Sequence, residues 1–569
     1  MIHPETEQNS GVAKAAGSAP GPAPHAAGAM VGAALLLSAC GGGGGTAAQT
    51  DGQSQPTAPV DTPIADADAA RFLAQASMGA SRAQMAVLQT QGYAGWIDAQ
   101  FALPASDTRW DWLMAKGFNG ISNQFSEAGF DAAMWRKLIT SPDTLRQRVA
   151  LALSEIAVVA IGGLDGAGWH AFSAAAYMDL LEANAFGNYR TLLDQISTSA
   201  AMGQFLTFRG NLKANPVTGA LPDENYAREL MQLFTIGLVQ LNIDGTPKPG
   251  GGLPQDTYGQ DDVTGLARVF TGWDFDMAGH DATTPDFMRR PMIQFATRHE
   301  NGAANFLGGS VPAGLGGAAA MKAALDIIFA HPNVAPFISR QLIQKLVTSN
   351  PSPAYVARVA TVFNNDGAGV KGNLRAVVKT LLLDPEARLG KPDTAFGKLR
   401  EPMLRFLAWA RAYGATSASD AWNIGNTSDP AARLGQSPLR SPSVFNFFRP
   451  GYVPPNSAIA TAALVAPEFQ LANESSVVGY VNYMQRAVGS GIGDVKADYT
   501  ALLALADNAA GLLAEINVVL AAGQLSAETV SLLRGALDGM PAGTDARRLN
   551  RIYAALTLVL AAPEFLVQK

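Results

Sequence analysis

The sequence PDENYARELMQLFTIG, at residues 222–237, combines a helix start, an apolar side and a helix stop. Asp223 is able to accept hydrogen bonds from the first helical N–H groups, and Gly237 is a residue type that ends helices. The apolar residues that would form the buried side are Leu230, Leu233, Phe234 and Ile236. The pattern therefore predicts a helix that packs one face into a core.

The helical period recurs along most of the chain. Apolar residues return every three or four positions at 66–76, 82–91, 143–160, 174–199, 225–235, 263–270, 318–329, 336–348, 353–364, 374–383, 398–413, 499–520, 526–537 and 545–560. One segment differs, because Asp244-Gly245 is a turn signal between short apolar stretches. We therefore predict an all-α fold, a large multi-helix domain with a small β-hairpin insertion near 241–260.

Composition limits the classes of protein to consider. The chain has 569 residues, of which 48% are hydrophobic, so it is long enough to bury a large core. Its formal net charge is −6 and it has no basic stripe. Proteins that bind nucleic acid neutralise phosphates with such stripes, so we expect no nucleic-acid partner.

The N-terminal region has the features of an export signal. A small apolar run from Ala26 to Ala39 precedes Cys40, the only cysteine, and the end Leu37-Ser38-Ala39-Cys40 resembles a lipobox. The resemblance implies that Cys40 becomes the acylated first residue of the mature protein. Because the residue after Cys40 is Gly41 rather than Asp, we expect the lipoprotein to lie in the outer membrane, facing the periplasm or the cell surface. The alternative is that Cys40 is an incidental small residue in a disordered leader.

Composition also predicts the order of domains. Residues 1–39 are the lipoprotein signal segment, and residues 40–65 are a flexible tether rich in Gly, Ser, Pro and Thr. Residues 66–475 are the main helical domain. Residues 476–569 are a C-terminal helical part of the same region.

Polar residues concentrate on the helix predicted at 222–237. Glu224 and Arg228 are four residues apart, as are Asn225 and Glu229, so the pairs lie on adjoining strips of one surface. Such a group points into a polar cavity or forms a buried ion-pair network that holds neighbouring helices. Arg268, farther along, is placed to pair with Glu224 or Glu229.

Few other residues suggest a catalytic or metal-binding site. His299 and Glu300 could bind a divalent metal together with a helix carboxylate, but a lone loop histidine is more often a hydrogen-bonding residue. The sequence contains no HExxH, GxSxG, Walker loop or dinucleotide-binding fingerprint. We therefore expect no metal centre and no cofactor.

Several segments together resemble the bacterial family known as domain of unknown function 1800, DUF1800. They are Ala70–Leu73, Leu145–Ala150, Ala185–Arg190, Pro222–Gly237, Phe270–Trp273, His299, Phe306–Gly308, His331–Pro332, Lys398–Pro402, Leu434–Gln436 and Ala562–Gln568. The resemblance implies a helical, exported protein. It also implies a partner from the DUF1501 family, whose members look like metal-dependent sulfatase or phosphatase relatives.

One segment departs from the family pattern. Many relatives have a Trp-containing turn after Leu434–Gln436, whereas this chain has SVFNFFRP at residues 443–450. The aromatic side chains there, with Arg449, could stack on a sugar or on another aromatic group. The alternative is that this segment packs as part of the core or as a lid, which would explain the same residues.

These observations support two functions. The first is a lipid-anchored protein that binds or assembles with an extracytoplasmic partner protein or polymer; its candidate binding residues are Asn225, Arg268, Trp273, Phe447 and Arg449. The second is a hydrolase or lyase acting on an extracytoplasmic polymer. Its candidate catalytic residues are Glu224 or Glu229 as acid or base, Arg228, which tunes them, and His299 as a second proton carrier. An enzyme needs these groups around an open pocket, whereas a scaffold could bury them.

Overall fold

A computed structural model describes residues 63–569, apart from 165, 167, 252 and 391–394. The described residues belong to one compact unit, Thr62–Lys569. Cys40, the lipobox and nearly all of the predicted tether lie outside the described residues. Within the described part of the chain, no helix is both long enough and apolar enough to span a membrane.

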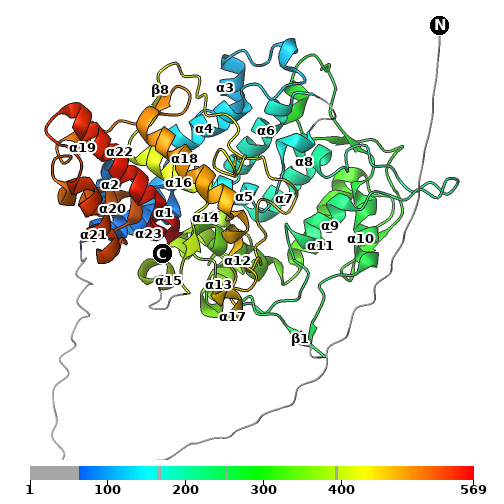
Figure 1. Ribbon diagram of the computed structural model, residues 1–569. Helices are drawn as coiled ribbons and strands as arrows, with labels where there is room; N and C mark the ends of the chain where they lie inside the picture. Colours follow the sequence, from blue (N-terminus) through cyan, green and yellow to red (C-terminus); the bar gives the residue numbers. More distant parts are fainter. Residues whose placement is uncertain (1–62, 165, 167, 252, 391–394) are drawn as a thin grey trace, which may run out of the picture. The chain divides into compact units, whose positions relative to one another are not determined.

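Helices dominate the fold (Figure 1), and the described residues form 23 α-helices. The helices of the first half are α1 Asp66–Ala76, α2 Arg82–Ala102, α3 Arg109–Ala115, α4 Phe130–Thr140, α5 Thr144–Ser154, α6 His170–Ala183, α7 Tyr189–Thr198, α8 Ala200–Phe205, α9 Asn225–Gln232 and α10 Gln260–Ala267. Those of the second half are α11 Gly317–Ala330, α12 Val334–Leu346, α13 Pro353–Asn364, α14 Leu374–Leu383, α15 Pro385–Leu389, α16 Pro402–Ala412, α17 Ala458–Thr461, α18 Glu474–Ser490, α19 Thr500–Leu503, α20 Ala509–Ala521, α21 Ala527–Asp538, α22 Asp545–Ala561 and α23 Pro563–Leu566. Short 3₁₀ helices are η1 Ile121–Asn123, η2 Ile161–Gly163, η4 Arg268–Phe270, η5 Asp286–Arg289 and η6 Pro467–Leu471.

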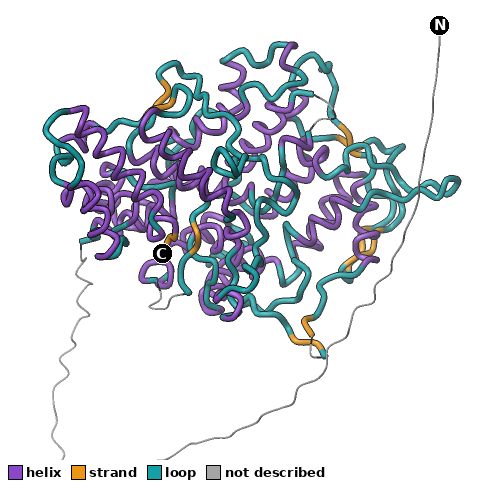
Figure 2. Tube along the Cα trace, in the orientation of Figure 1, coloured by secondary structure: helices purple, strands orange, loops and turns teal. Residues whose placement is uncertain are grey.

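The strands are short antiparallel pairs scattered among the helices (Figure 2). They are β1 Pro249–Gly250 with β2 Leu253–Pro254, β3 Trp273–Asp274 with β4 Ile293–Gln294, β5 Ala304–Phe306 with β6 Gly309–Val311, β7 Lys398–Leu399 with β10 Val567–Gln568, and β8 Thr416–Ser417 with β9 Val495–Lys496. The β1–β2 hairpin and the bridge between Leu241 and Pro247 lie inside the predicted insertion. The prediction of an all-α fold with a small hairpin near 241–260 is confirmed.

Helix α5 lies in the core, where it packs against α2, α4, α6 and α12. Every residue of α5 except Arg146 is buried, and the buried set includes the polar residues Gln147 and Arg148. Each of these two residues contributes to a different buried polar network. The helix therefore carries charge as well as apolar packing into the centre of the fold.

Two predicted helices are each divided in two. The apolar pattern predicts continuous helices over 174–199 and 499–520, but α6 ends at Ala183 and α7 begins at Tyr189, and α19 ends at Leu503 and α20 begins at Ala509. Asn188 accepts a hydrogen bond from the Arg190 N–H and so caps α7. The Tyr189 N–H donates to the carbonyl oxygen of Gly372, which fixes the break against a distant loop.

Candidate functional site

Helix α9 forms as the sequence predicts, although it ends earlier. The Asp223 carboxylate accepts a hydrogen bond from the Asn225 N–H at 2.7 Å, so it stabilises the start of the helix. Gly237 has a φ of +70°, and its N–H donates to the Met231 carbonyl oxygen, which closes the C-terminal turn. Regular helix stops at Gln232 because the following backbone folds into this turn.

Glu224 is a half-buried carboxylate surrounded by donors. It pairs with Arg228 at 3.1 Å, as the four-residue spacing predicts. It also accepts hydrogen bonds from Thr264 and Gln260 of α10, each at 2.7 Å. Partial burial disfavours its ionised form, but these two hydrogen bonds and the Arg228 charge outweigh burial and lower the pKa of Glu224.

Glu229 lies in the opposite environment on the same helix. Its residue is only 6% exposed, and no described group donates a hydrogen bond to its Oε2 atom. Burial raises the pKa of Glu229, and the Arg228 charge offsets only part of this effect. Of the two carboxyls, Glu229 is therefore the better proton donor.

Asn211 connects the motifs that the sequence leaves far apart. Its side chain accepts from the Asp223 N–H at 2.8 Å and donates to the carbonyl oxygens of Asp223 at 3.1 Å and Phe270 at 3.5 Å. Its own carbonyl oxygen accepts from the Gly272 N–H at 2.7 Å. The start of α9 is thus fixed to the 270–274 segment. We call residues 207–213, 223–228, 268–274 and 295–300 the Asn211 face.

Further contacts complete the Asn211 face. Asn225 donates to the Thr207 hydroxyl at 3.3 Å, and the Thr207 hydroxyl donates to Asp223 at 2.9 Å. The Lys213 N–H donates to the Arg298 carbonyl oxygen at 2.9 Å. The face therefore gathers the predicted residues Glu224, Asn225 and Arg228 with the segments that contain Arg268, Trp273 and His299. The sequence gives no signal for Asn211, because its partners lie 12 and 59 residues away.

Arg268 pairs with a residue other than the predicted ones. Its guanidinium lies 3.3 Å from the Glu300 carboxylate, so the expected pairing with Glu224 or Glu229 is wrong. The physical reason is the position of Arg268 at the end of α10, one turn beyond Thr264, the residue that contacts Glu224. Beside Arg268 and Glu300 lies a cavity of about 10 Å³, which has room for a single water molecule.

His299 is held inside the Asn211 face rather than in an open cleft. It is buried, and its Nδ1 lies 3.0 Å from the Thr271 carbonyl oxygen. Because a carbonyl oxygen only accepts, Nδ1 carries the hydrogen and Nε2 has the free lone pair. Burial lowers the pKa of His299, and the Thr271 contact and the Glu300 charge only partly oppose it. The side chain is therefore a neutral imidazole at physiological pH.

Trp273 belongs to the protein interior. It is 3% exposed, and its Nε1–H donates to the Val269 carbonyl oxygen at 3.2 Å. Its edge lines a cavity of about 460 Å³ between α7 and α11. Arg190 and Asp326, on the wall of that cavity, form an ion pair at 2.9 Å. The cavity is charged, but its walls are already paired.

The segment at 443–450 packs on the fold through one aromatic side chain. Phe448 is buried, and the Lys345 ammonium lies 4.0 Å from the centre of its ring. Phe447 is half-buried. Arg449 is exposed and lies over the ring of Phe445 at 4.9 Å. Among the described residues, no hydrogen bond, ion pair or ring contact thus joins Phe447 or Arg449 to the Asn211 face.

Beneath Phe448 lies a buried charge cluster that the sequence analysis missed. Its contacts join the Lys345 ammonium to the Glu155 carboxyl at 2.7 Å, and the Lys398 ammonium to Glu468 at 2.9 Å and to Glu401 at 3.5 Å. Arg148 donates to the Lys345 carbonyl oxygen at 2.5 Å. The available signal was the presence of charged residues in apolar helical stretches, but the spacing does not show which of them meet.

Glu155 and Glu401 share this cluster with opposite protonation. Burial and the neighbouring Glu401 raise the pKa of Glu155 to about 8, although Lys345 opposes the shift. Burial also opposes ionisation of Glu401, but Lys398, contact with Glu155, Lys345 and Arg148 outweigh it and lower the pKa of Glu401 to about 2. Because two adjacent buried carboxylates cannot both ionise cheaply, Glu155 keeps the proton.

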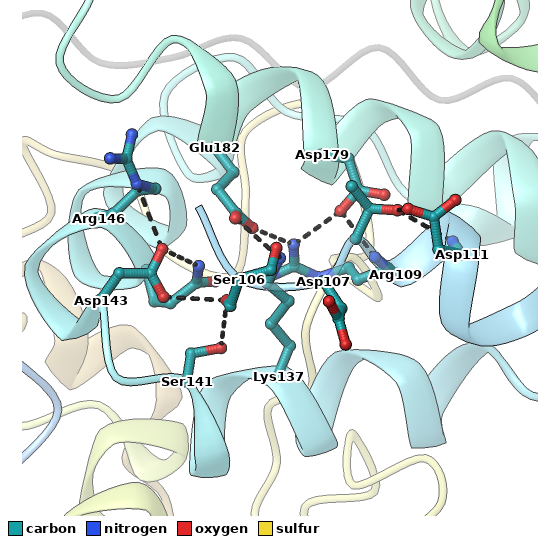
Figure 3. A network of polar contacts seen from close by, with 12 residues as sticks. Ser106, Asp107, Arg109, Asp111, Lys137, Ser141, Asp143, Arg146, Asp179 and Glu182 are labelled. Carbon is teal, nitrogen blue, oxygen red and sulfur yellow. Dashed lines mark hydrogen bonds and ion pairs between the residues drawn. The ribbon is translucent and has the colours of Figure 1, made fainter. Parts of the chain in front are cut away.

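A second buried network joins α3, α4 and α6 (Figure 3). Glu182 points between Arg109 and Lys137, with a distance of 2.8 Å to each. Gln147 accepts from Arg109 at 3.0 Å and donates to Asp143 at 3.3 Å, so α5 is tied into the network. These charges are paired with one another across α3, α4 and α6, which is the pattern of a structural network.

The described residues contain no group of three or more His, Cys, Asp or Glu side chains that could hold a metal ion. Comparison with known proteins adds a family match. The family model described as "Protein of unknown function (DUF1800)" matches residues 71–567. No curated protein and no solved structure matches the chain.

Proposed function

The chain belongs to the DUF1800 family, which is described as of unknown function, and from this premise we propose a function based on the Asn211 face. The protein is an exported, lipid-anchored helical protein that binds an extracytoplasmic partner through this face. The partner that the family resemblance favours is a DUF1501-family protein. The support for export and anchoring is the sequence Leu37-Ser38-Ala39-Cys40.

One observation favours binding over catalysis. The charged groups of the Asn211 face are half-exposed and held in place by hydrogen bonds, while His299 is buried beside a cavity of about 10 Å³. The groups expected of an enzyme therefore do not surround an open pocket at this face. Fixed, partly exposed charges on a rigid base suit recognition of another molecule, because their side chains lose little freedom on binding.

A hydrolase or lyase remains a second candidate because of Glu224 and Glu229. The pKa of Glu224 is lowered and that of Glu229 is raised, although the two flank the same Arg228. In enzymes, environments that separate the pKa values of two carboxyl groups make one of them a base and the other an acid. In this alternative, Glu224 is the base and Glu229 is the acid.

Capture on an immobilised DUF1501-family protein from the same genome tests the binding function. The full chain is compared with Arg228→Ala, which removes a charge from the Asn211 face, and with Arg534→Ala as a control. Arg534 forms a similar helical pair with Asp538 at 3.3 Å on α21. We expect capture of the wild type and the control, with much weaker capture of Arg228→Ala. Equal capture of all three, or capture of none, contradicts the function.

The lipid anchor is tested separately. Cells that express the full chain or Cys40→Ser are labelled with a radioactive fatty acid and fractionated. We expect label and membrane association for the wild type, and neither for Cys40→Ser. Label on both proteins, or on neither, contradicts the anchor.

A further inference from the structure

Two arginine side chains hold a single carboxylate at one edge of the Asn211 face, and the backbone of a lysine lies beside them. Asp274 accepts from Arg209 Nε at 2.9 Å and from an Arg298 Nη atom at 3.1 Å. Lys213 lies beside them, since its N–H donates to the Arg298 carbonyl oxygen, and its side chain is exposed. No described carboxylate forms an ion pair with Lys213. Among Arg209, Lys213, Asp274 and Arg298, three positive charges and one negative charge leave an excess of two positive charges.

Aromatic rings support both guanidinium groups. The Arg209 guanidinium lies 3.9 Å from the centre of the Phe275 ring, and that of Arg298 lies 5.0 Å from the centre of Phe295. Phe295 is 38% exposed, so part of its ring is open to solvent. We call Arg209, Lys213, Asp274, Phe275, Phe295 and Arg298 the Asp274 platform.

The backbone holds the Asp274 platform rigid. The β3–β4 pair joins the segment of Asp274 to the segment before Phe295. The Phe295 N–H donates to the Gly272 carbonyl oxygen at 2.8 Å, and the Gly210 N–H donates to that of Trp273 at 2.7 Å. The Arg209 and Arg298 side chains are therefore largely positioned before any ligand arrives, which reduces the entropic cost of binding.

We propose that the Asp274 platform binds an acidic polysaccharide, an inference that rests on the binding function above and names a polymer for the same face. Planar guanidinium groups match carboxylate or sulfate oxygens in pairs. An exposed phenyl ring offers an apolar surface to the C–H face of a sugar ring. The excess charge disfavours a neutral polymer, and a patch this small on a chain of net charge −6 disfavours nucleic acid.

Binding of the full chain to labelled polysaccharides tests the proposal. The probes are polygalacturonate, which carries carboxylates; heparin, which carries sulfates; dextran, which is neutral; and poly-glutamate, an acidic peptide. We expect binding to polygalacturonate or heparin, with weakening as salt is raised because exposed charges are screened. The acidic polysaccharide that binds identifies the group that the platform prefers.

The double variant Lys213→Gln/Arg298→Gln supplies the residue-level test. It is expected to bind about tenfold more weakly than the wild type, whereas Arg534→Gln, an exposed arginine on α21, is expected to bind as the wild type does. A circular dichroism melt checks that each variant is folded; if the double variant melts early, Lys213→Gln alone replaces it, because its side chain is exposed.

Three results overturn the proposal: no binding to either acidic polysaccharide, whether or not poly-glutamate binds; equal binding to dextran; or unchanged binding by the folded variant. Capture on the DUF1501-family protein is measured with the same preparations. If capture succeeds while polysaccharide binding fails, only the polysaccharide inference falls. If capture fails as well, the binding function falls with it.

Discussion

Asn211 and Asp223 exchange two hydrogen bonds: the Asp223 N–H donates to Asn211 Oδ1 at 2.8 Å, and Asn211 Nδ2 donates to the Asp223 carbonyl oxygen at 3.1 Å. Asn211 is buried, so its removal leaves backbone groups without partners. We expect Asn211→Ala to lower the free energy of unfolding by about 1–3 kcal/mol, measured by urea denaturation. Asn242→Ala, at an exposed asparagine of the hairpin region, should change it by less than about 0.5 kcal/mol. Equal losses would show that Asn211 has no special role.

Replacing Glu229 or Glu224 with the neutral glutamine should have different effects on the free energy of unfolding. The pKa of Glu229 is raised by burial, so its stabilising contribution is present at low pH and is lost as pH rises through its folded-state pKa. At neutral pH, Glu229→Gln should therefore be as stable as the wild type or more stable. The pKa of Glu224 is lowered, so its contribution is present at neutral pH, and Glu224→Gln should lose about 1 kcal/mol. A loss of about 3 kcal/mol or more in Glu229→Gln would instead indicate a buried ionic network.

Glu155 should give the protein a pH-dependent stability. Its pKa is raised to about 8, so the folded chain binds a proton that the unfolded chain has released, and stability falls as pH rises from about 5 to about 8. Glu155→Gln imitates the protonated form and should flatten that part of the profile in urea denaturation. Glu528→Gln, at an exposed glutamate of α21, is the control. Parallel profiles for the wild type and Glu155→Gln would contradict the raised pKa of Glu155.

Gly237 should tolerate no side chain. Its φ is +70°, and a Cβ atom there would lie 2.5 Å from the Phe337 ring. Gly117 has a similar φ of +75°, but no described atom lies within 4 Å of its Cβ position. Both alanine variants should lose about 1 kcal/mol or more from backbone strain, and Gly237→Ala should lose more because Phe337 must move. Thermal melts compare the two, and equal losses would show that Phe337 moves freely.

The sequence predicts the fold class well because helical periodicity is a local property. Residues 222–237 carry both ends of α9, and the Asp244-Gly245 turn signal marks the hairpin region. The continuous helix predicted over 174–199 is wrong because Asn188 caps α7 and the Tyr189 N–H bonds to the distant Gly372. The spacing of apolar residues does not reveal a helix cap that depends on contact with a loop far away in the chain.

The site could be predicted only in part. The Glu224–Arg228 pair follows from a four-residue spacing on a helix, so the sequence contains it. The partner of Arg268 depends on where the loop with Glu300 folds, and the role of Asn211 depends on contacts to residues as distant as Phe270. The proximity of Glu155 and Glu401, which lie far apart in the chain, likewise depends on tertiary packing.

We propose that Asn211 assembles a surface that binds a partner. The most direct test of this proposal is the affinity of the full chain for a DUF1501-family protein from the same genome, measured by calorimetry for the wild type, Asn211→Ala and the Asn242→Ala control at a temperature where all three are folded. We predict a measurable affinity for the wild type and the control, and an affinity about tenfold weaker or more for Asn211→Ala. Equal affinities for folded wild type and Asn211→Ala, or no heat of binding for the wild type, would contradict the account.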